Sequence, residues 1–391
     1  MSVFDELVGQ AEVVTQLEAA AAAAAAALSG GAGAGMTHAW LFTGPPGSGR
    51  SVAARAFAAA LQCPDAGCGH CHVCHQTLGG SHPDVAVVVP EGLSLGVAEV
   101  RRIVGHAARR PMHDRWQVTI IEDADRMPDY ASNALLKAIE EPPPSGVILL
   151  CAPGADDVLP TIRSRCRLVP LRTPSPSDVA SVLVERDGVD PSMAAFAARA
   201  AQGHIGRARR LATDEQSRKE RSDVLSLPRH LANVGQALRA ASDLVEAAKA
   251  EADTLAAGRD TEEREALSTA LGGGATGKGY TGSAPKGGAG ALKELEKRQK
   301  SRGTRTQRDA LDRALLDLAA FYRDVLALQL RTGATLVHAD LAEQAAVVAR
   351  GGAAESTLRR IEAVLACRSS LEGNVAPQLA VEAMALALRD G

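Results

Sequence analysis

The chain has 391 residues, enough for two to three domains at a typical size of about 150 residues each. Its 43 Lys and Arg against 46 Asp and Glu give a net charge of −3, which argues against both a histone-like nucleic-acid binder and an acidic disordered tail. Alanine supplies much of the 46% apolar content, and Phe, Tyr and Trp are scarce, with 5, 3 and 2 copies. This composition predicts a helix-rich protein with cores of Leu, Val and Ala.

The start of the chain shows no export or membrane signal. Met1 to Glu6 is acidic where a secretory signal would be basic. Ala19 to Leu28 is the most apolar stretch, but it falls short of the roughly 18 uninterrupted apolar residues of a membrane helix, and we expect a packed or surface helix there. Four of the seven cysteines are clustered, which suits a reducing compartment. We expect a cytoplasmic protein with no membrane partner.

Strand and helix patterns alternate through the first 150 residues. Short apolar runs predict buried strands at 39–42, 85–89, 118–121 and 147–150. Helical patterns lie between them, at 51–61, from Val97 to Val104, and through Leu135 until the prolines that start at Pro142. This alternation predicts a parallel sheet covered by helices on both faces, with ligands at the carboxyl ends of its strands.

Beyond Pro170 the strand signal disappears and amphipathic helices are expected to the end of the chain. Pro174 and Pro176 mark the boundary. One interruption, at about 271–308, is rich in glycine and poor in apolar residues, and we expect it to be flexible. Between Lys278 and Arg308, nine basic residues against two acidic ones give +7, so this segment is either a solvated linker or a tether that meets phosphate.

A phosphate-binding loop is the first chemical motif. The segment from Gly44 to Ser51 fits the spacing of the motif G-x-x-x-x-G-K-[ST], follows a predicted strand and opens a predicted helix. Glycines there allow backbone N–H groups to converge on an anion at the helix amino terminus. The seventh position holds arginine, whose planar guanidinium does not replace the compact lysine ammonium. The candidate phosphate-contacting residues are Gly44, Gly47, Gly49, Arg50 and Ser51.

The acidic pair expected after the third strand is also altered. A magnesium-holding Asp followed by a catalytic Glu would complete a nucleotide site, but the chain has Glu122 followed by Asp123. The exchange moves each carboxylate by one methylene, which matters for a rigid octahedral ion. We expect a phosphate-loop fold without turnover, so binding of ATP or ADP is doubtful, while competent ATP hydrolysis stays as the alternative.

A cysteine cluster follows the first predicted helix of this region. Its four thiolates lie within twelve residues and match the stoichiometry of a closed structural zinc site, at Cys63, Cys68, Cys71 and Cys74. Nearby His70, His72 and His75 are expected to be spectators, because four sulfurs already satisfy the ion. Zinc here would fold the loop and would not catalyse.

Together, these motifs resemble the clamp-loader branch of the AAA+ ATPases, and within it the delta-prime-type subunits of bacterial DNA polymerase III. The resemblance covers residues 3 to about 211. Besides the phosphate loop and the cysteines, it rests on Phe4 to Gln10, on Asn133 to Pro143, and on Ser164, Arg165 and Cys166.

The resemblance implies an α/β AAA+ P-loop core with an inserted zinc module, followed by an all-α lid and an all-α collar. The implied bounds are 1–169 for the core, with the zinc module at 63–74, then 170–212 for the lid and 213–391 for the collar. It also implies a hetero-pentameric ring with motor and clamp-opening subunits, which meets the sliding clamp and primed DNA during replication.

In this family the arginine of the Ser-Arg-Cys motif acts as an arginine finger, reaching ATP held by the neighbouring subunit. The resemblance gives that role to Arg165, with Ser164 and Cys166 completing the motif. It also places Ala152 or Pro153 where a γ-phosphate sensor would lie, and Gly206 where motor subunits carry a sensing arginine. A defective own site beside an intact finger indicates a stator, a subunit that completes another subunit's active site.

Two other functions stay open. The first is a motor-type subunit of the same machine that binds and hydrolyses ATP despite Arg50. The second is a zinc-containing nucleic-acid-binding module that uses the +7 segment, although the shortage of aromatic residues argues against base stacking. In the stator interpretation the chain has no polymerase site, and its own ATPase is weak or absent.

Overall fold

The computed structural model describes residues 2–31, 33, 35–93, 95–113, 115–271 and 288–391. The chain forms two compact units. The amino-terminal unit comprises Met1–Pro90 and Ser94–Thr213, and the carboxy-terminal unit comprises Glu91–Leu93 and Asp214–Gly391. Each is described by itself below.

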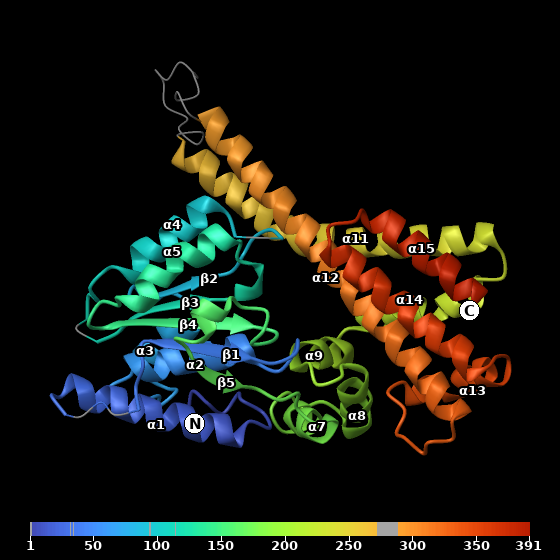
Figure 1. Cartoon of the computed structure of the whole chain (residues 1–391), viewed down its shortest axis with the longest axis horizontal. Coiled ribbons are helices and arrows are strands. Elements are labelled where there is room, and N and C mark those ends of the chain that lie inside the picture. Colours follow the sequence, from blue (N-terminus) through green and yellow to red (C-terminus); the bar gives the residue numbers. More distant parts are fainter. Residues whose placement is uncertain (1, 32, 34, 94, 114, 272–287) are drawn as a thin grey trace. The chain divides into compact units, whose positions relative to one another are not determined.

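A five-stranded parallel sheet organises the amino-terminal unit, in the order β2-β3-β4-β1-β5 (Figure 1). The four predicted strands are present, and the predicted α/β P-loop fold class is confirmed. The bounds are Ala39–Thr43 for β1, Val85–Val88 for β2, Gln117–Ile121 for β3, Gly146–Ala152 for β4 and Arg167–Pro170 for β5.

The fifth strand was not predicted from the sequence. In β5 only Val169 is buried, because the strand lies at the edge of the sheet beside β1. With one buried side chain in four residues, β5 lacks the continuous apolar run that marks the central strands.

Helices cover both faces of the sheet, and alternate residues of one strand serve two separate cores. Trp40 and Phe42 of β1 pack with α1, α2 and the cysteine loop, whereas Ala39 and Leu41 pack with α4 and α5. The Trp40 ring meets Phe57 of α2 edge-on, with the ring centroids 4.9 Å apart. The helices are α1 (Ala11–Leu28), α2 (Arg50–Gln62), α3 (His72–Leu78), α4 (Val97–Ala107), α5 (Asp129–Glu140) and α6 (Pro160–Arg163).

Helix α1 is long and apolar enough by composition to be a candidate membrane span, with a mean hydropathy of 1.3. One face, formed by Val13, Leu17, Ala20, Ala21 and Ala24, is buried in the core shared with α2. A helix that buries one stripe against a domain core is the packed helix that the sequence predicted.

Three short helices complete the amino-terminal unit and are called the lid helices. They have their own small core around Val179, Leu183, Ala197 and Ala208. Their bounds are Pro176–Glu185 for α7, Pro191–Ala200 for α8 and Ile205–Thr213 for α9. Ser175 caps α7 by accepting a hydrogen bond from the Asp178 N–H, so this helix begins at the proline-marked boundary.

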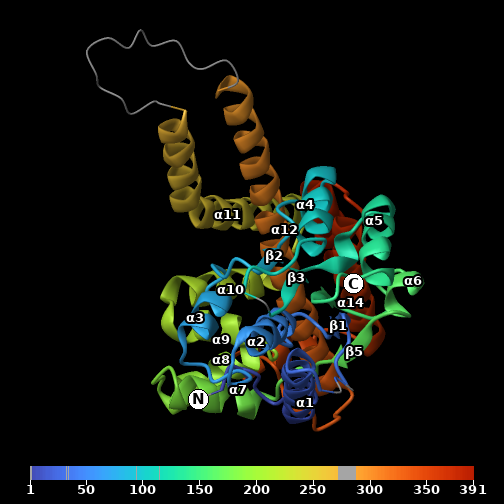
Figure 2. The ribbon, with the colours of Figure 1, turned by 90° about the vertical axis from the view of Figure 1, so that its left-hand side faces the viewer.

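Helices are the regular secondary structure in the described part of the carboxy-terminal unit, and they enclose a core built on Leu311, Leu315, Phe321 and Val381. Its helices are α10 (Glu215–Ser226), α11 (Val234–Ala270), α12 (Gly288–Gln329), α13 (Ala342–Arg350), α14 (Ala354–Glu372) and α15 (Pro377–Asp390). Helices α11 and α12 run side by side as a long hairpin (Figures 1 and 2).

The prediction of a flexible segment at about 271–308 is wrong for its second part. Residues 288–308 belong to α12, and residues 272–287 lie outside the described residues. Arg302 of α12 contacts Asp260 and Glu263 of α11 at 2.5 and 2.7 Å, and its hydrogen bond to Glu263 is the main cause that lowers the pKa of that carboxyl to about 2. Pairing with α11 therefore supplies the contacts that apolar residues would otherwise provide.

The positive charge of this segment is largely neutralised within the hairpin. Residues 288–308 carry seven basic and two acidic side chains, or +5, while 251–270 carry six acidic and two basic ones, or −4. Arg313 of α12 likewise contacts Glu251 of α11 at 2.7 Å. The described part of the hairpin is therefore close to neutral, which weakens the interpretation of this segment as a phosphate-binding tether.

Candidate functional site

The phosphate loop and the acidic pair lie at the same edge of the sheet, as predicted. Parallel register aligns Thr43 of β1 with Ala152 of β4, and Ile121 of β3 with Leu150 of β4. Gly44 and Glu122 follow directly after β1 and β3. The carboxyl ends of three neighbouring strands thus form the edge at which doubly wound sheets bind ligands.

The loop has the backbone conformation of a phosphate-binding loop, but the side chain of its own Arg50 is hydrogen-bonded to that backbone. Gly47 and Gly49 have φ values of +88° and +92°, which glycine adopts without strain, and α2 begins at Arg50. The Arg50 Nη1 donates a hydrogen bond back to the Gly44 carbonyl oxygen. The guanidinium is therefore directed to the loop's own backbone, while Ser51 lies half-buried in the first turn of α2.

The acidic pair is also engaged within the chain. Arg55 of α2 donates from Nη2 and Nε to Glu122 Oε1 at 2.9 and 3.3 Å. Asp123 follows with a φ of +49°, a left-handed conformation that is uncommon for a residue with a side chain. Glu122 stands where a magnesium-holding carboxylate is expected, and its pairing with Arg55 offsets the charge that would attract a cation.

The segment just before α9 of the lid helices packs against the phosphate loop. A Cβ on Gly47 would lie 2.7 Å from both Cα and Cβ of His204, the residue just before α9, so only glycine fits at this approach. Gly206 lies on α9 beneath the same imidazole, whose Cε1 would be 3.4 Å from a Cβ added there. The predicted sensor position at Ala152 ends β4 and is fully buried, without any polar side-chain atom.

Gln10 joins the loop to the start of the lid. Its side-chain amide donates to the Ser48 and Arg172 carbonyls at 3.3 and 2.6 Å, and its Oε1 accepts from the Arg172 N–H at 3.2 Å. The side chain is buried, so these contacts are shielded from water. Gln10, the last residue of the Phe4 to Gln10 motif, therefore ties the phosphate loop to the segment that follows β5.

The Ser164-Arg165-Cys166 turn lies at the opposite edge of the sheet, directly before β5. Arg165 is 41% exposed and contacts Glu140 at the end of α5, with Nη2 and Oε1 2.8 Å apart. Its Nη1 donates to the Thr161 carbonyl oxygen at 2.9 Å and to Ser164 Oγ at 3.3 Å. The guanidinium is thus held in one direction while part of it stays open to solvent.

Cys166 plays a different part in the same turn. It packs against the core that contains α4 and α5, and burial raises the pKa of its thiol to about 12. A thiol with so high a pKa stays protonated and is a poor nucleophile. Cys166 therefore anchors the turn by packing against the core, and among the three motif residues only Arg165 carries a charged side chain.

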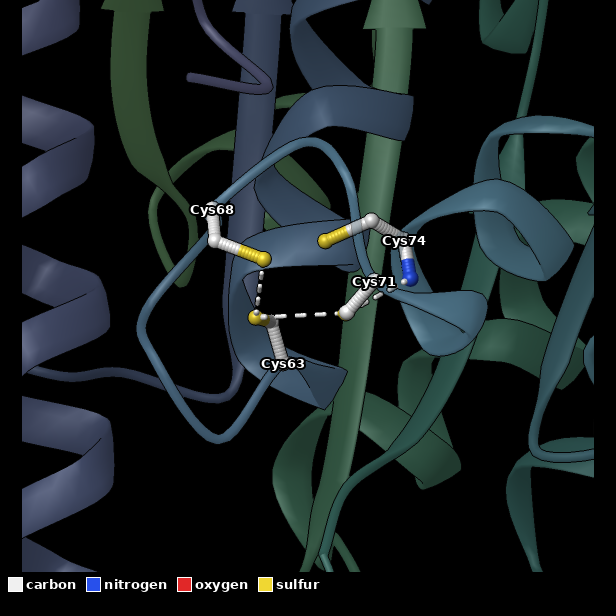
Figure 3. Close-up of side chains that lie close together, drawn as sticks. All are labelled: Cys63, Cys68, Cys71 and Cys74. Carbon is white, nitrogen blue, oxygen red and sulfur yellow. Dashed lines mark hydrogen bonds between the residues drawn. The ribbon is translucent and has the colours of Figure 1, made fainter. Parts of the chain in front are cut away.

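The four cysteines form a compact cluster (Figure 3). The Cys63 sulfur lies 3.7 Å from that of Cys68 and 3.8 Å from that of Cys71, and all four sulfurs, including that of Cys74, lie within 4.8 Å of one another. Four sulfurs at about 2.3 Å from a tetrahedral zinc ion would be about 3.8 Å apart. The donor set and its spacing fit a metal ion, and the three nearby histidines are exposed and outside the cluster.

The four cysteines differ in their surroundings: burial raises the pKa of Cys71 and Cys74, whereas the pKa of Cys68, like that of Cys63, is lowered by backbone hydrogen bonds. Burial raises the pKa of Cys63, but hydrogen bonds from the backbone of Cys68, Gly67 and Asp65 outweigh it and lower that pKa to about 7. Cys63 ends α2 and Cys71 caps α3, where its sulfur accepts from the Cys74 N–H at 3.4 Å. The loop is therefore anchored by a helix at each end.

Several functional contacts were not predicted from the sequence. Arg55, His204 and Glu140 pair with or cover predicted site residues. Arg55 lies on the same helix as Arg50, but five residues further along it faces another direction, so the helical periodicity gave no signal for its pairing with Glu122. The other two are far from their partners in sequence, and only folding brings them together.

Comparison with known proteins supports the resemblance over the first half of the chain. Residues 26–175 match the family model described as DNA polymerase III, delta subunit. The delta' subunit of Bacillus subtilis DNA polymerase III is 31% identical over 195 residues, which is 49% of this chain and 59% of that protein. The delta' subunit of Pseudomonas aeruginosa is 38% identical over 151 residues, 37% of this chain and 45% of that protein.

A gamma/tau subunit is similar to nearly the same extent. That of Mycobacterium bovis is 32% identical over 194 residues, 48% of this chain and 32% of that protein. The chain therefore spans about half the length, or less, of the curated relatives it matches. The matched region is where the phosphate loop, the four cysteines and the Ser-Arg-Cys turn lie, and over it the chain is similar to both delta' and gamma/tau subunits of DNA polymerase III.

Proposed function

We propose that this chain is a delta-prime-type stator of a DNA polymerase III clamp loader, which supplies Arg165 to ATP bound by a neighbouring subunit. One observation carries the proposal: the chain's own phosphate site is engaged by Arg50, Arg55 and His204, whereas Arg165 faces solvent. A guanidinium offered in trans stabilises the charge that develops on the transferred phosphoryl group. The partners are then motor and clamp-opening subunits and, through the ring, the sliding clamp and primed DNA.

A motor function is the second candidate, because gamma/tau subunits are similar at 32% identity. The site geometry disfavours it. Phosphoryl transfer depends on positioned charge, and here the Arg50 guanidinium is directed at Gly44 while Glu122 is neutralised by Arg55. Micromolar binding of Mg–ATP by the isolated chain, together with hydrolysis, would favour the motor function instead.

We also propose that the cysteine cluster binds one structural zinc ion. Cys63, Cys68, Cys71 and Cys74 would hold it with no open coordination position, so it would stabilise the loop after α2 and take no part in phosphoryl transfer. A nucleic-acid-binding role is disfavoured, because the described part of the hairpin balances its basic side chains with acidic ones.

The decisive experiment uses a ring reconstituted from this chain with motor and clamp-opening subunits. Arg165→Ala should lower DNA-stimulated ATP turnover at the site that Arg165 completes by about 10³ or more. Size-exclusion chromatography should show an intact ring. Arg163→Ala is the matched control, since Arg163 ends α6 directly before the turn and pairs with Asp156. A normal rate in an assembled Arg165→Ala ring would refute the stator proposal.

A further inference from the structure

A second cluster of metal-ligating side chains lies apart from the four cysteines and from the phosphate loop. His82 and Asp84 precede β2, and His113 lies in the loop before β3, so the three gather at the amino ends of these strands. Each offers one ligand atom, and these atoms lie within 4.8 Å of one another. Neither the phosphate site nor the arginine turn involves these residues.

Asp84 is the fixed member of the cluster. Its carboxylate is 1% exposed and accepts hydrogen bonds from the Met112 N–H at 2.7 Å and from the His113 N–H at 3.2 Å. The His113 ring adds a third contact, with Nδ1 2.7 Å from Asp84 Oδ2. The carboxylate thus holds both the backbone of the 112–113 loop and the orientation of an imidazole, as carboxylates do in histidine metal sites.

His82 completes the set from the other side. The ring is buried and accepts from the Asp84 N–H at Nδ1, 3.2 Å away, and its centroid lies 5.4 Å from that of His113. The ligand atoms of His82, Asp84 and His113 are thus brought together, and imidazole nitrogen and carboxylate oxygen are both ligands of zinc.

We propose that His82, Asp84 and His113 bind a divalent transition-metal ion of the zinc class, which replaces the proton shared between His113 Nδ1 and Asp84 Oδ2. Two imidazoles and one carboxylate are the ligands of open zinc sites, in which water takes the fourth position. Ligand atoms about 2.1 Å from a tetrahedral ion lie about 3.4 Å apart. Opening the present 2.7 Å contact by roughly 0.7 Å is feasible, because the His113 side chain is 57% exposed and can move outward.

The test measures zinc bound to the full chain after equilibration with micromolar free zinc. A mercurial reagent releases zinc held by thiolates, whereas zinc held by imidazole and carboxylate exchanges first into a chelator. We expect one chelator-exchangeable zinc per chain in addition to the thiolate-held ion. His113→Ala should lose the exchangeable ion and keep the other, with an unchanged circular dichroism spectrum.

His70→Ala is the matched control, because His70 is an exposed histidine beside the cysteine cluster. It should keep both ions. A wild-type chain without exchangeable zinc, or a His113→Ala variant that retains it, would overturn the proposal. Because the readout is metal content, this result is independent of whether the chain acts as a stator.

Discussion

Arg50 and Arg165 lie at opposite ends of the sheet's strands, and they differ in how far each side chain is enclosed by its own chain. Arg50 stands in a phosphate loop at the carboxyl edge and donates to the carbonyl of that loop, under a lid residue that leaves no room for a Cβ on Gly47. Arg165 stands before β5 at the other edge, oriented by Glu140 and the Thr161 carbonyl yet partly exposed. Both guanidinium groups therefore bond to their own chain, and the difference is that Arg165 keeps part of its side chain open to solvent, as the proposed role in trans requires.

Under the proposed stator function, the fold keeps the backbone of a phosphate loop while the charges around that loop are changed. The positive φ values at Gly47 and Gly49 preserve the cradle, whereas Arg50 and the Arg55–Glu122 pair change its electrostatics. Backbone geometry and charge are therefore separable, and it is the charge that phosphoryl transfer depends on.

Next to the loss expected for Arg165→Ala, the largest expected effect on turnover is that of Arg165→Lys in the reconstituted ring. Lysine keeps the positive charge but lacks the planar fork that contacts phosphate with two N–H groups, so we expect turnover at the completed site to fall by about 10² or more. Presteady-state ATP hydrolysis in the assembled ring measures it. Turnover equal to wild type would mean that charge alone matters and would weaken the contrast between the two edges.

Loss of the proposed zinc site should destabilise the amino-terminal unit and leave the carboxy-terminal unit unchanged. The effect should extend to the phosphate loop, because α2 runs from Arg50 to the residue before Cys63. Cys74 is fully buried, and Cys74→Ser should lower the free energy of unfolding of the amino-terminal unit by about 4 kcal/mol through loss of the metal. Both tryptophans, Trp40 and Trp116, lie in the core beside the cluster, so their fluorescence during urea unfolding reports this unit.

The control for this prediction is Cys367→Ser in the carboxy-terminal unit. Cys367 is also buried, and its burial raises the pKa of its thiol to about 11, but it lies outside the cysteine cluster. This variant should leave the urea midpoint of the unfolding transition seen by tryptophan fluorescence unchanged. If Cys74→Ser did the same, the metal would be dispensable for the fold of the loop.

The close approach of the lid to the phosphate loop can be tested with two alanine substitutions. Gly47 and Gly49 share a positive φ, but a Cβ on Gly47 would meet His204 at 2.7 Å, whereas one on Gly49 would meet nothing within 4 Å. Backbone strain of about 1–2 kcal/mol is common to both, and Gly47→Ala should cost about 1–2 kcal/mol more. Thermal unfolding compares them; equal costs would indicate that His204 moves away freely.

The smallest expected effect is a partial restoration of nucleotide binding. Arg50→Lys combined with Arg55→Ala supplies a compact ammonium and releases Glu122, so affinity for Mg–ATP should rise about tenfold, or about 1.4 kcal/mol. Titration calorimetry on the isolated chain measures it, with Arg50→Lys alone as the control that should gain less. Tight binding by the wild type would contradict the view that these side chains disable the site.

Much of the fold and of the candidate site could be predicted from local patterns. Central strands such as β1 and β3 are continuous apolar runs because both of their faces are buried. Glycine spacing indicated the phosphate loop, and cysteine spacing indicated the metal cluster, because both depend on residues close together in sequence. The edge strand β5 and the helix at 288–308 were not predicted, because neither depends mainly on its own apolar residues. Pairing with the neighbouring strand stabilises β5, and ion pairs with α11 stabilise the helix.

The sequence by itself determined which chemical groups are present: an arginine in a phosphate loop, a reversed acidic pair, four cysteines and a Ser-Arg-Cys turn. Only the tertiary structure decided which of these groups are engaged within the chain. Arg55 neutralises Glu122, His204 covers Gly47, and Glu140 orients Arg165. The physical reason is that hydrogen bonds and steric contacts depend on distances of a few ångströms between residues from separate segments, and these distances are set only when the sheet and its helices pack.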